Sequence, residues 1–313
     1  MNTKNNLAHI KSINTLKTYI ILGILFAIII IFGLIITNLT GNINYLWGAV
    51  ATSVIMNFTS YFYSDKIALA MSDAIQLERY LANKQLIDKD YIKDNVHIYK
   101  NIVKDLSIKN NMPEPMLYII EDMSPNAFAT GRNENNAAIA VTTGLLSVMS
   151  TEELRGIIAH ELSHIKNKDI LIMSVVIVAV SIFSILSQAI MHISSISNNG
   201  NNDKPSGILL FFSMVAAITM PIASMIVQAS ISQKREYMAD ASGALLAEDN
   251  LGLINALKKL ASINMPLNKA NPATAHLFIT NPFGLLESQG FLQKLFMTHP
   301  PIEDRIAALE NSN

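Results

Sequence analysis

The chain has 313 residues, of which 50% are hydrophobic and only 15% are charged, whereas a soluble globular protein carries about a quarter charged residues. The formal net charge is −1 and no block of lysine or arginine dominates any stretch, so the electrostatic footprint of a nucleic-acid-binding protein is absent from the sequence. There is no cysteine, which excludes disulfides, thiolate catalysis and cysteine-based zinc sites and leaves histidine and carboxylate as the strong metal ligands.

Four apolar segments predict four transmembrane helices. They run from Tyr19 to Thr37, from about Ile43 to Phe62, from Ile170 to Ile193 and from Gly207 to Ile231. A helix of about 20 apolar residues crosses the core of a bilayer. A cleaved signal peptide is the alternative for the first segment, and a buried helical hairpin is the alternative for the last two. The length of the first segment and the absence of charge from the others favour membrane spans.

The distribution of basic residues predicts the orientation. Lys4, Lys11 and Lys17 precede the first span, and the short connection between the first two spans carries no basic residue. Because cytoplasmic segments carry the excess of lysine and arginine, four spans would place both termini in the cytoplasm. The predicted parts are the tail with the first two spans (1–63), two cytoplasmic parts (64–169 and 232–313) and the transmembrane hairpin between them (170–231).

The first cytoplasmic part combines the patterns of helices and of a small sheet. Apolar residues recur at helical spacing from Ala68 to about Asn110, with a break near Ile87. Two short β-favouring runs follow, Met116–Ile120 and Ala137–Thr143, and a polar turn precedes the second.

The next predicted helix carries a zinc-binding motif. Ser150-Thr151-Glu152-Glu153 fits a capping box, so this helix is expected to begin at Thr151. Along it, His160-Glu161-Leu162-Ser163-His164 is an H-E-x-x-H pentapeptide, whose two histidines project from one helix face and can bind one zinc ion. Glu161 lies beside them and can act as the base that activates the attacking water. The alternative is a pair of histidines without a metal.

A catalytic zinc ion takes three protein ligands and keeps one position open. Glu236 is the candidate third ligand, because a membrane hairpin between it and the H-E-x-x-H helix would return the chain to the metal. Asp240 lies one helical turn later and can hydrogen-bond a ligating imidazole. The alternative is that both acids are solvated charges that balance Lys234 and Arg235.

Four motifs resemble those of the HtpX membrane metalloproteases, which are relatives of the type 1 CAAX prenyl proteases. The motifs are Asn126-Ala127-Phe128-Ala129-Thr130-Gly131, His160-Glu161-Leu162-Ser163-His164, Arg235-Glu236-Tyr237-Met238-Ala239-Asp240 and Thr298-His299-Pro300-Pro301-Ile302-Glu303-Asp304-Arg305. The resemblance implies a mainly α membrane protein, with four transmembrane helices and a cytoplasmic gluzincin-type α+β zinc peptidase domain that bears a small β-sheet.

The resemblance also implies a function. Such a protein holds one zinc ion per chain and lies in the bacterial cytoplasmic (inner) membrane with its active site in the cytoplasm. It is an endopeptidase of the stress response that hydrolyses misfolded or damaged membrane proteins. A functional link to other membrane quality-control proteases would follow.

Carried over position by position, the resemblance makes His160, His164 and Glu236 the zinc ligands. Glu161 becomes the catalytic base, and Asp240 becomes a supporting acid. The strand that matches the substrate-binding edge strand of this family consists of Ala138, Ile139, Ala140, Val141 and Thr142.

Two further positions match residues expected near the active site. Asn126 and His299 could each stabilise the oxyanion of the tetrahedral intermediate. Asn126 could instead form a turn, and His299 could instead cap a C-terminal helix.

Three other functions are compatible with parts of the sequence. A transporter or channel would fit four spans, but their interiors contain no charged residue to line an ion path. An inactive scaffold would be favoured if a ligand or the base were missing, and none is. A processing peptidase of the CAAX type that acts on defined substrates remains the alternative within the enzyme class.

Overall fold

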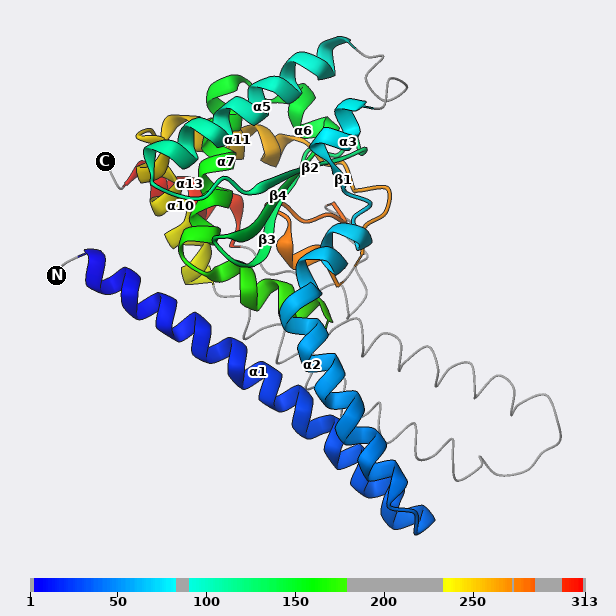
Figure 1. Cartoon of the computed structure of the whole chain (residues 1–313). Coiled ribbons are helices and arrows are strands. Elements are labelled where there is room, and N and C mark those ends of the chain that lie inside the picture. The colour runs from blue at the N-terminus through cyan, green and yellow to red at the C-terminus, as the bar shows by residue number, and fades with distance from the viewer. Residues whose placement is uncertain (1–2, 83–89, 179–232, 272, 285–299, 312–313) are drawn as a thin grey trace.

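The structure is a computed structural model that describes residues 3–82, 90–178, 233–271, 273–284 and 300–311. It is mostly helical with one small sheet (Figure 1). The helices are α1 (Thr3–Thr40), α2 (Asn44–Met71), α3 (Leu77–Ala82), α5 (Asp90–Lys109), α6 (Thr143–Val148), α7 (Thr151–Lys166), α10 (Gln233–Ala247), α11 (Leu251–Ser262), η1 (Ala275–Leu277) and α13 (Ile302–Glu310), together with the helical segment Asp169–Val178. The strands are β1 (Ile75–Gln76), β2 (Met116–Ile120), β3 (Ala127–Asn133) and β4 (Asn136–Thr142).

Helices α1 and α2 form a long antiparallel hairpin that extends away from the sheet (Figure 1). Within the described ranges, one helix is long and apolar enough to cross a membrane, namely Ser12–Ile35 of α1, with a mean hydropathy of 2.9. The second predicted span is a continuous helix in α2, but its polar residues leave it less apolar. The third and fourth predicted spans lie outside the described residues, except for 170–178. The four-span arrangement therefore stays a prediction.

The sheet has the strand order β1-β2-β4-β3. Strands β2 and β4 are parallel, whereas β1 pairs antiparallel with β2 and β3 pairs antiparallel with β4. Strand β4 is therefore internal, because it has a hydrogen-bonded strand on each side. The prediction that residues 138–142 form the edge strand for the substrate is wrong, since both edges of that strand are already occupied. Among the described strands, β1 and β3 are the two edge strands of the sheet, and β3 is the one next to β4.

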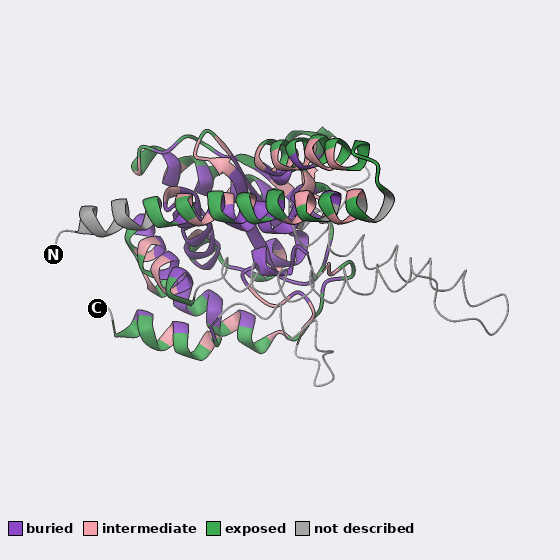
Figure 2. Cartoon of the chain, turned by 90° about the horizontal axis from the view of Figure 1, so that it is seen from below, coloured by how far each residue is buried: buried purple, intermediate pink, exposed green. Residues whose placement is uncertain are grey.

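Burial explains why β4 is internal. Ile139 and Val141 belong to a core shared with α5 and α7, and Ala138 and Ala140 belong to a second core shared with the end of α2 and with the segment Asp169–Val178. A strand that is buried on both faces is apolar at nearly every position, as β4 is. Figure 2 shows that the buried residues of the chain gather around the sheet, while α1 is exposed along much of its length.

Strand β3 has a register irregularity between Gly131 and Asn133, just before the turn to β4. Gly131 has a φ of 142°, and a Cβ atom at this position would meet the backbone of Asn136 and Ala137. Only glycine adopts this conformation without strain, so Gly131 allows the close approach of β3 and β4 at this irregularity. The sequence pattern predicted β2 correctly as Met116–Ile120, but it did not identify β3 as a strand. The predicted break near Ile87 lies outside the described residues.

Helix α7 lies at the centre of the helical layer and packs against both α10 and α11. Its predicted capping box is confirmed: the Ser150 hydroxyl accepts from the Glu153 N–H, and the Glu153 carboxylate accepts from the Ser150 N–H. Glycines allow the two close helix contacts. Gly156 of α7 lies against the backbone of Leu253 in α11, and Gly243 of α10 lies against the backbone of His160.

The close contact at Gly243 yields a test of the packing. A Cβ atom at Gly243 would lie 2.9 Å from the backbone N and Cα atoms of His160, so Gly243→Ala must push α10 away from α7. Overpacking of this kind costs about 1–3 kcal/mol, so the midpoint of thermal unfolding in detergent with chelator present should fall. The control is Gly48→Ala in α2, where the added Cβ meets nothing within 4 Å. Equal midpoints for the two variants would contradict the proposed tight contact.

Candidate metal centre

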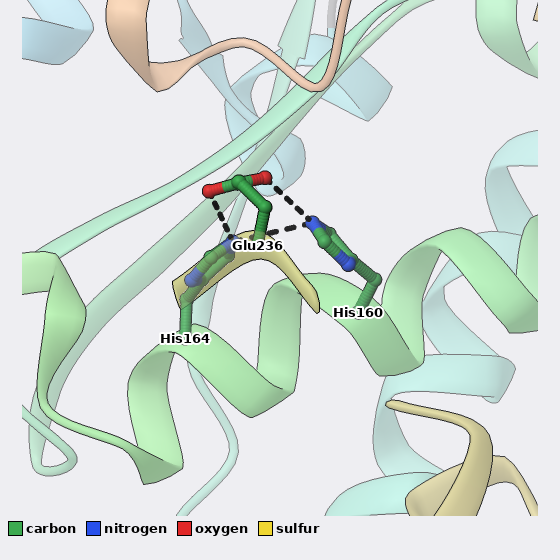
Figure 3. Close-up of side chains that lie close together, drawn as sticks. All are labelled: His160, His164 and Glu236. Atoms are coloured by element: carbon green, nitrogen blue, oxygen red, sulfur yellow. Dashed lines mark hydrogen bonds and ion pairs between the residues drawn. The ribbon is translucent and has the colours of Figure 1, made fainter. Parts of the chain in front are cut away.

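Helices α7 and α10 bring three predicted metal ligands together. The Nε2 atoms of His160 and His164 are 3.2 Å apart, and each lies 3.8 Å from a carboxylate oxygen of Glu236. All three side chains are buried, and one ligand atom from each lies within 4.8 Å of the others. In Figure 3 the two rings rise from α7 towards the Glu236 carboxylate, which comes from α10.

These positions fit one zinc ion. Two nitrogen atoms bound at about 2.0–2.1 Å to a tetrahedral zinc ion are about 3.3 Å apart, close to the observed separation of the Nε2 atoms. Two imidazoles and one carboxylate are a donor set that zinc accepts in catalytic sites, with the fourth position left for water or substrate.

Each ligating imidazole has a carboxylate on its far side. The Nδ1 atom of His160 lies 2.9 Å from Asp240 Oδ1, and the Nδ1 atom of His164 lies 3.1 Å from Asp169 Oδ2. A carboxylate that accepts the Nδ1 proton fixes the tautomer and directs the Nε2 lone pair to the metal. The structure thus places the predicted Asp240 behind one histidine, and it places Asp169 behind the other.

Asp240 is itself held by Arg305 from the C-terminal helix α13. The Nε and Nη2 atoms of Arg305 donate to the two Asp240 oxygens at 2.9 and 2.7 Å, and the arginine side chain is fully buried. Burial alone would raise the pKa of Asp240, but the charge and hydrogen bonds of Arg305 lower it to about 2. Arg305 therefore keeps Asp240 ionised behind His160.

Asp169 reaches His164 because the chain reverses at the end of α7. The helix ends at Lys166, and Lys168 adopts a left-handed backbone with a φ of 60°. This turn brings Asp169 back beneath the ring of His164, where the carboxylate has no exposed surface. The sequence spacing of five residues is too long for one helical turn, so the contact depends on the left-handed residue.

The surroundings of His164 are strongly negative. Burial lowers its pKa, but the hydrogen bond to Asp169 and the charges of Glu236 and Asp169 outweigh that effect and raise the pKa to about 9. A buried site that stabilises a positive imidazole to this extent also stabilises a bound cation. The electrostatics of the centre thus agree with the geometry of its ligands.

Glu161 lies on the side of α7 that faces β3. It is buried, and its carboxylate accepts a hydrogen bond from the backbone N–H of Ala129. Burial raises the pKa of Glu161 to about 7, against the opposing effects of His164 and of the Ala129 N–H. A carboxyl group with a pKa near neutrality can both accept and return a proton, which suits a general base.

The two weaker site predictions have different outcomes. The Asn126 side chain joins the start of β3 to a later segment: its Nδ2 donates to Thr280 O, and its Oδ1 accepts from Thr280 N. Its role at an oxyanion stays a prediction. His299 lies outside the described residues.

Sequence reasoning missed two residues of this centre, Asp169 and Arg305. A signal existed for Arg305, because it belongs to one of the four motifs, but nothing in the local pattern pairs it with Asp240 across 65 positions. For Asp169, its place just beyond the H-E-x-x-H helix was the available signal.

The buried pair of Arg305 and Asp240 yields a second test. Arg305→Met leaves the buried Asp240 without its positively charged partner, so the free energy of unfolding should fall by about 3–5 kcal/mol. The control is Lys258→Met in α11. This variant breaks an exposed ion pair with Glu310, which lies on α13 as Arg305 does, and it should cost at most about 1 kcal/mol. Chemical unfolding with chelator present measures both. Equal losses would show that the buried pair has no special role.

Comparison with known proteins agrees with this centre. Residues 97–313 match peptidase family M48. The Protease HtpX homolog of Thermoanaerobacter pseudethanolicus is 41% identical, over 82% of this chain and 81% of that protein. The Protease HtpX homolog of Caldanaerobacter subterraneus is 35% identical, over 99% of this chain and 99% of that protein. The one of Syntrophobacter fumaroxidans is 40% identical, over 94% of this chain and 98% of that protein.

Among solved structures, the crystal structure of S. mikatae Ste24p aligns with a TM-score of 0.45 and 19% identity, over 97% of this chain and 67% of that chain. The sequence matches cover most of this chain and of the relatives. The chain therefore belongs to peptidase family M48 and is a zinc metalloprotease of the HtpX group of membrane proteins.

Proposed function

We propose that this chain is a membrane-integrated endopeptidase that hydrolyses misfolded or damaged membrane proteins, with His160, His164 and Glu236 as the zinc ligands. The observation that carries this proposal is the arrangement of the three buried ligand atoms, with both Nε2 atoms facing the Glu236 carboxylate. Zinc bound there would act as a Lewis acid towards a peptide carbonyl and towards water. A functional link to other membrane quality-control proteases belongs to the same proposal.

Glu161 carries the proton in this proposal. It takes a proton from the attacking water and returns it to the amine of the leaving peptide. Its burial keeps bulk water away from the carboxylate, and its pKa of about 7 suits transfer in both directions near neutral pH. Asp240 and Asp169 hold the two imidazoles in the orientation that binding of the metal needs.

Strand β3 is the better candidate for the strand that binds substrate. Its inner edge pairs with β4, and on its outer edge Ala129 donates its N–H to the proposed base, Glu161. Near the ends of the strand, Ala127 O accepts from Ile279 N, and Gly131 N donates to the Ser174 hydroxyl. A substrate strand on this edge would lie directly against Glu161 and would take the place of the contact between Glu161 and the Ala129 N–H. Such pairing reads the peptide backbone and gives broad specificity.

The proposed topology is the one predicted from the sequence, with four spans, cytoplasmic termini and a cytoplasmic active site. Residues Tyr19 to Thr37 of α1 rise about 27 Å, close to the thickness of a bilayer core. Tyr19 lies at one end of this segment and Trp47 near the other, and both are exposed, as aromatic residues at the two interfaces would be. On α2, Ile55 and Phe58 are also exposed, which suits contact with lipid.

The base assignment is tested by Glu161→Gln, purified in detergent without chelator and with zinc restored. Zinc content should stay at about one ion per chain, because Glu161 is not a ligand, while casein cleavage should fall by about 10²–10⁴-fold. The control is Glu152→Gln, an exposed glutamate on the same helix. Cleavage by Glu161→Gln at the wild-type rate, or a wild type that binds no zinc, would refute the proposal.

The substrate mode is tested with peptides that carry one N-methylated amide at successive positions. If the substrate pairs with β3, methylation should lower kcat/KM at alternate positions, by about tenfold or more, because every second N–H faces the strand. Side-chain replacement at the same positions should change kcat/KM less. A profile that follows side chains would instead favour the site-specific processing peptidase.

A further inference from the structure

The first membrane helix reaches the candidate metal centre. Asn14 of α1 is buried, with 4% of its surface exposed, and its Nδ2 donates to Asp169 Oδ1 at 2.5 Å and to Asn167 O at 3.3 Å. The other oxygen of Asp169, Oδ2, lies 3.1 Å from Nδ1 of His164. One carboxylate therefore joins the first membrane helix to a proposed zinc ligand.

The contact is built into one face of α1. Asn14, Thr18, Ile21 and Leu25 are all buried, and their spacing of four, three and four residues puts them on the same side of the helix. Ile21 and Leu25 belong to the apolar core that also contains Ile172, Val175 and Val176 from the segment Asp169–Val178. This apolar packing sets the position of α1 against the rest of the protein. Asn14 adds a polar contact at the N-terminal end of the same buried face.

Burying an asparagine in α1 is unfavourable in free energy, and the hydrogen bonds of Asn14 offset this cost. A buried amide without hydrogen bonds is strongly unfavourable, and asparagine is a weaker helix former than leucine. Both acceptors of the Asn14 amide lie just beyond the H-E-x-x-H helix. Arg235 also approaches Asp169, with its Nε atom 3.8 Å from Oδ1, so this cation balances the charge while Asn14 makes the short hydrogen bond.

We propose that Asn14 is a positioning residue of the zinc site: by holding Asp169, it fixes the ring of His164 and so couples the seating of the first membrane helix to zinc affinity. The inference rests on the proposed role of His164 as a zinc ligand. Coupling of this kind is reciprocal, so zinc binding tightens the contact of α1 with the body to the same extent. The membrane anchor is then part of the metal centre.

The experiment measures zinc affinity by competition with a fluorescent chelator, in detergent, for wild type, Asn14→Leu, Asp169→Asn and the double variant. Loss of an outer partner typically weakens metal binding about 10–100-fold, so Asp169→Asn should fall in that range and Asn14→Leu somewhat below it, at about 3–10-fold. Because Asn14 acts through Asp169, the double variant should bind within about twofold of Asp169→Asn alone.

Thr18→Val is the matched control. Thr18 lies on the same buried face, one turn after Asn14, and its hydroxyl bonds only to Asn14 O among the contacts described, so zinc affinity should not change. If Asn14→Leu does not fold, Asn14→Ala removes the same amide without adding bulk. Thermal unfolding with chelator present checks that each variant is folded before zinc is added.

Two outcomes would overturn the inference: Asn14 variants that bind zinc as wild type does, or effects of Asn14→Leu and Asp169→Asn that simply add. Failure of the proposed function would look different, because wild type itself would then bind no zinc. The expected outcome is a loss at Asn14 that vanishes in the Asp169→Asn background.

Discussion

Two imidazoles can bind one metal ion only if the Nε2 lone pair of each points at the same position. The contacts around His160 and His164 hold the two rings in that arrangement. The Nδ1 atom of each ring must face another partner, and here each lies close to a buried carboxylate, Asp240 at 2.9 Å for His160 and Asp169 at 3.1 Å for His164. A neutral acceptor would fix the tautomer as well. A carboxylate also adds the negative charge that a cation requires.

Burying two carboxylates creates a second constraint, because a buried charge without a partner is very unfavourable. Arg305 meets this need for Asp240, and Asn14 with Arg235 meets it for Asp169. These partners come from the last helix, the first helix and α10. The metal centre is therefore assembled from both ends of the chain, and it is complete only when α1, α10 and α13 are all in place around it.

The difference between local contacts and contacts of distant segments explains which features the sequence could predict. The capping box of α7, the H-E-x-x-H pair and strand β2 follow from residues within a few positions of each other, and all three were found. Strand order and the pairing of Asp240 with Arg305 depend on contacts between distant segments, which local periodicity does not encode. The wrong prediction of the edge strand could have been avoided from the sequence. Residues 137–141 are apolar without alternation, which is typical of an internal strand buried on both faces.

The place of Asn14 along α1 also bears on which substrates can reach the site. Asn14 precedes Tyr19, where the span predicted from the sequence begins, by five residues, a rise of about 7–8 Å, so Asp169 contacts α1 near the N-terminal end of that span. In the proposed topology the catalytic residues then lie close beneath the cytoplasmic surface of the bilayer. In the proposed substrate mode, a polypeptide segment that has left the bilayer in extended form would pair with the outer edge of β3. Recognition through the backbone at that edge suits such segments, because misfolded membrane proteins share exposed peptide groups rather than a common sequence.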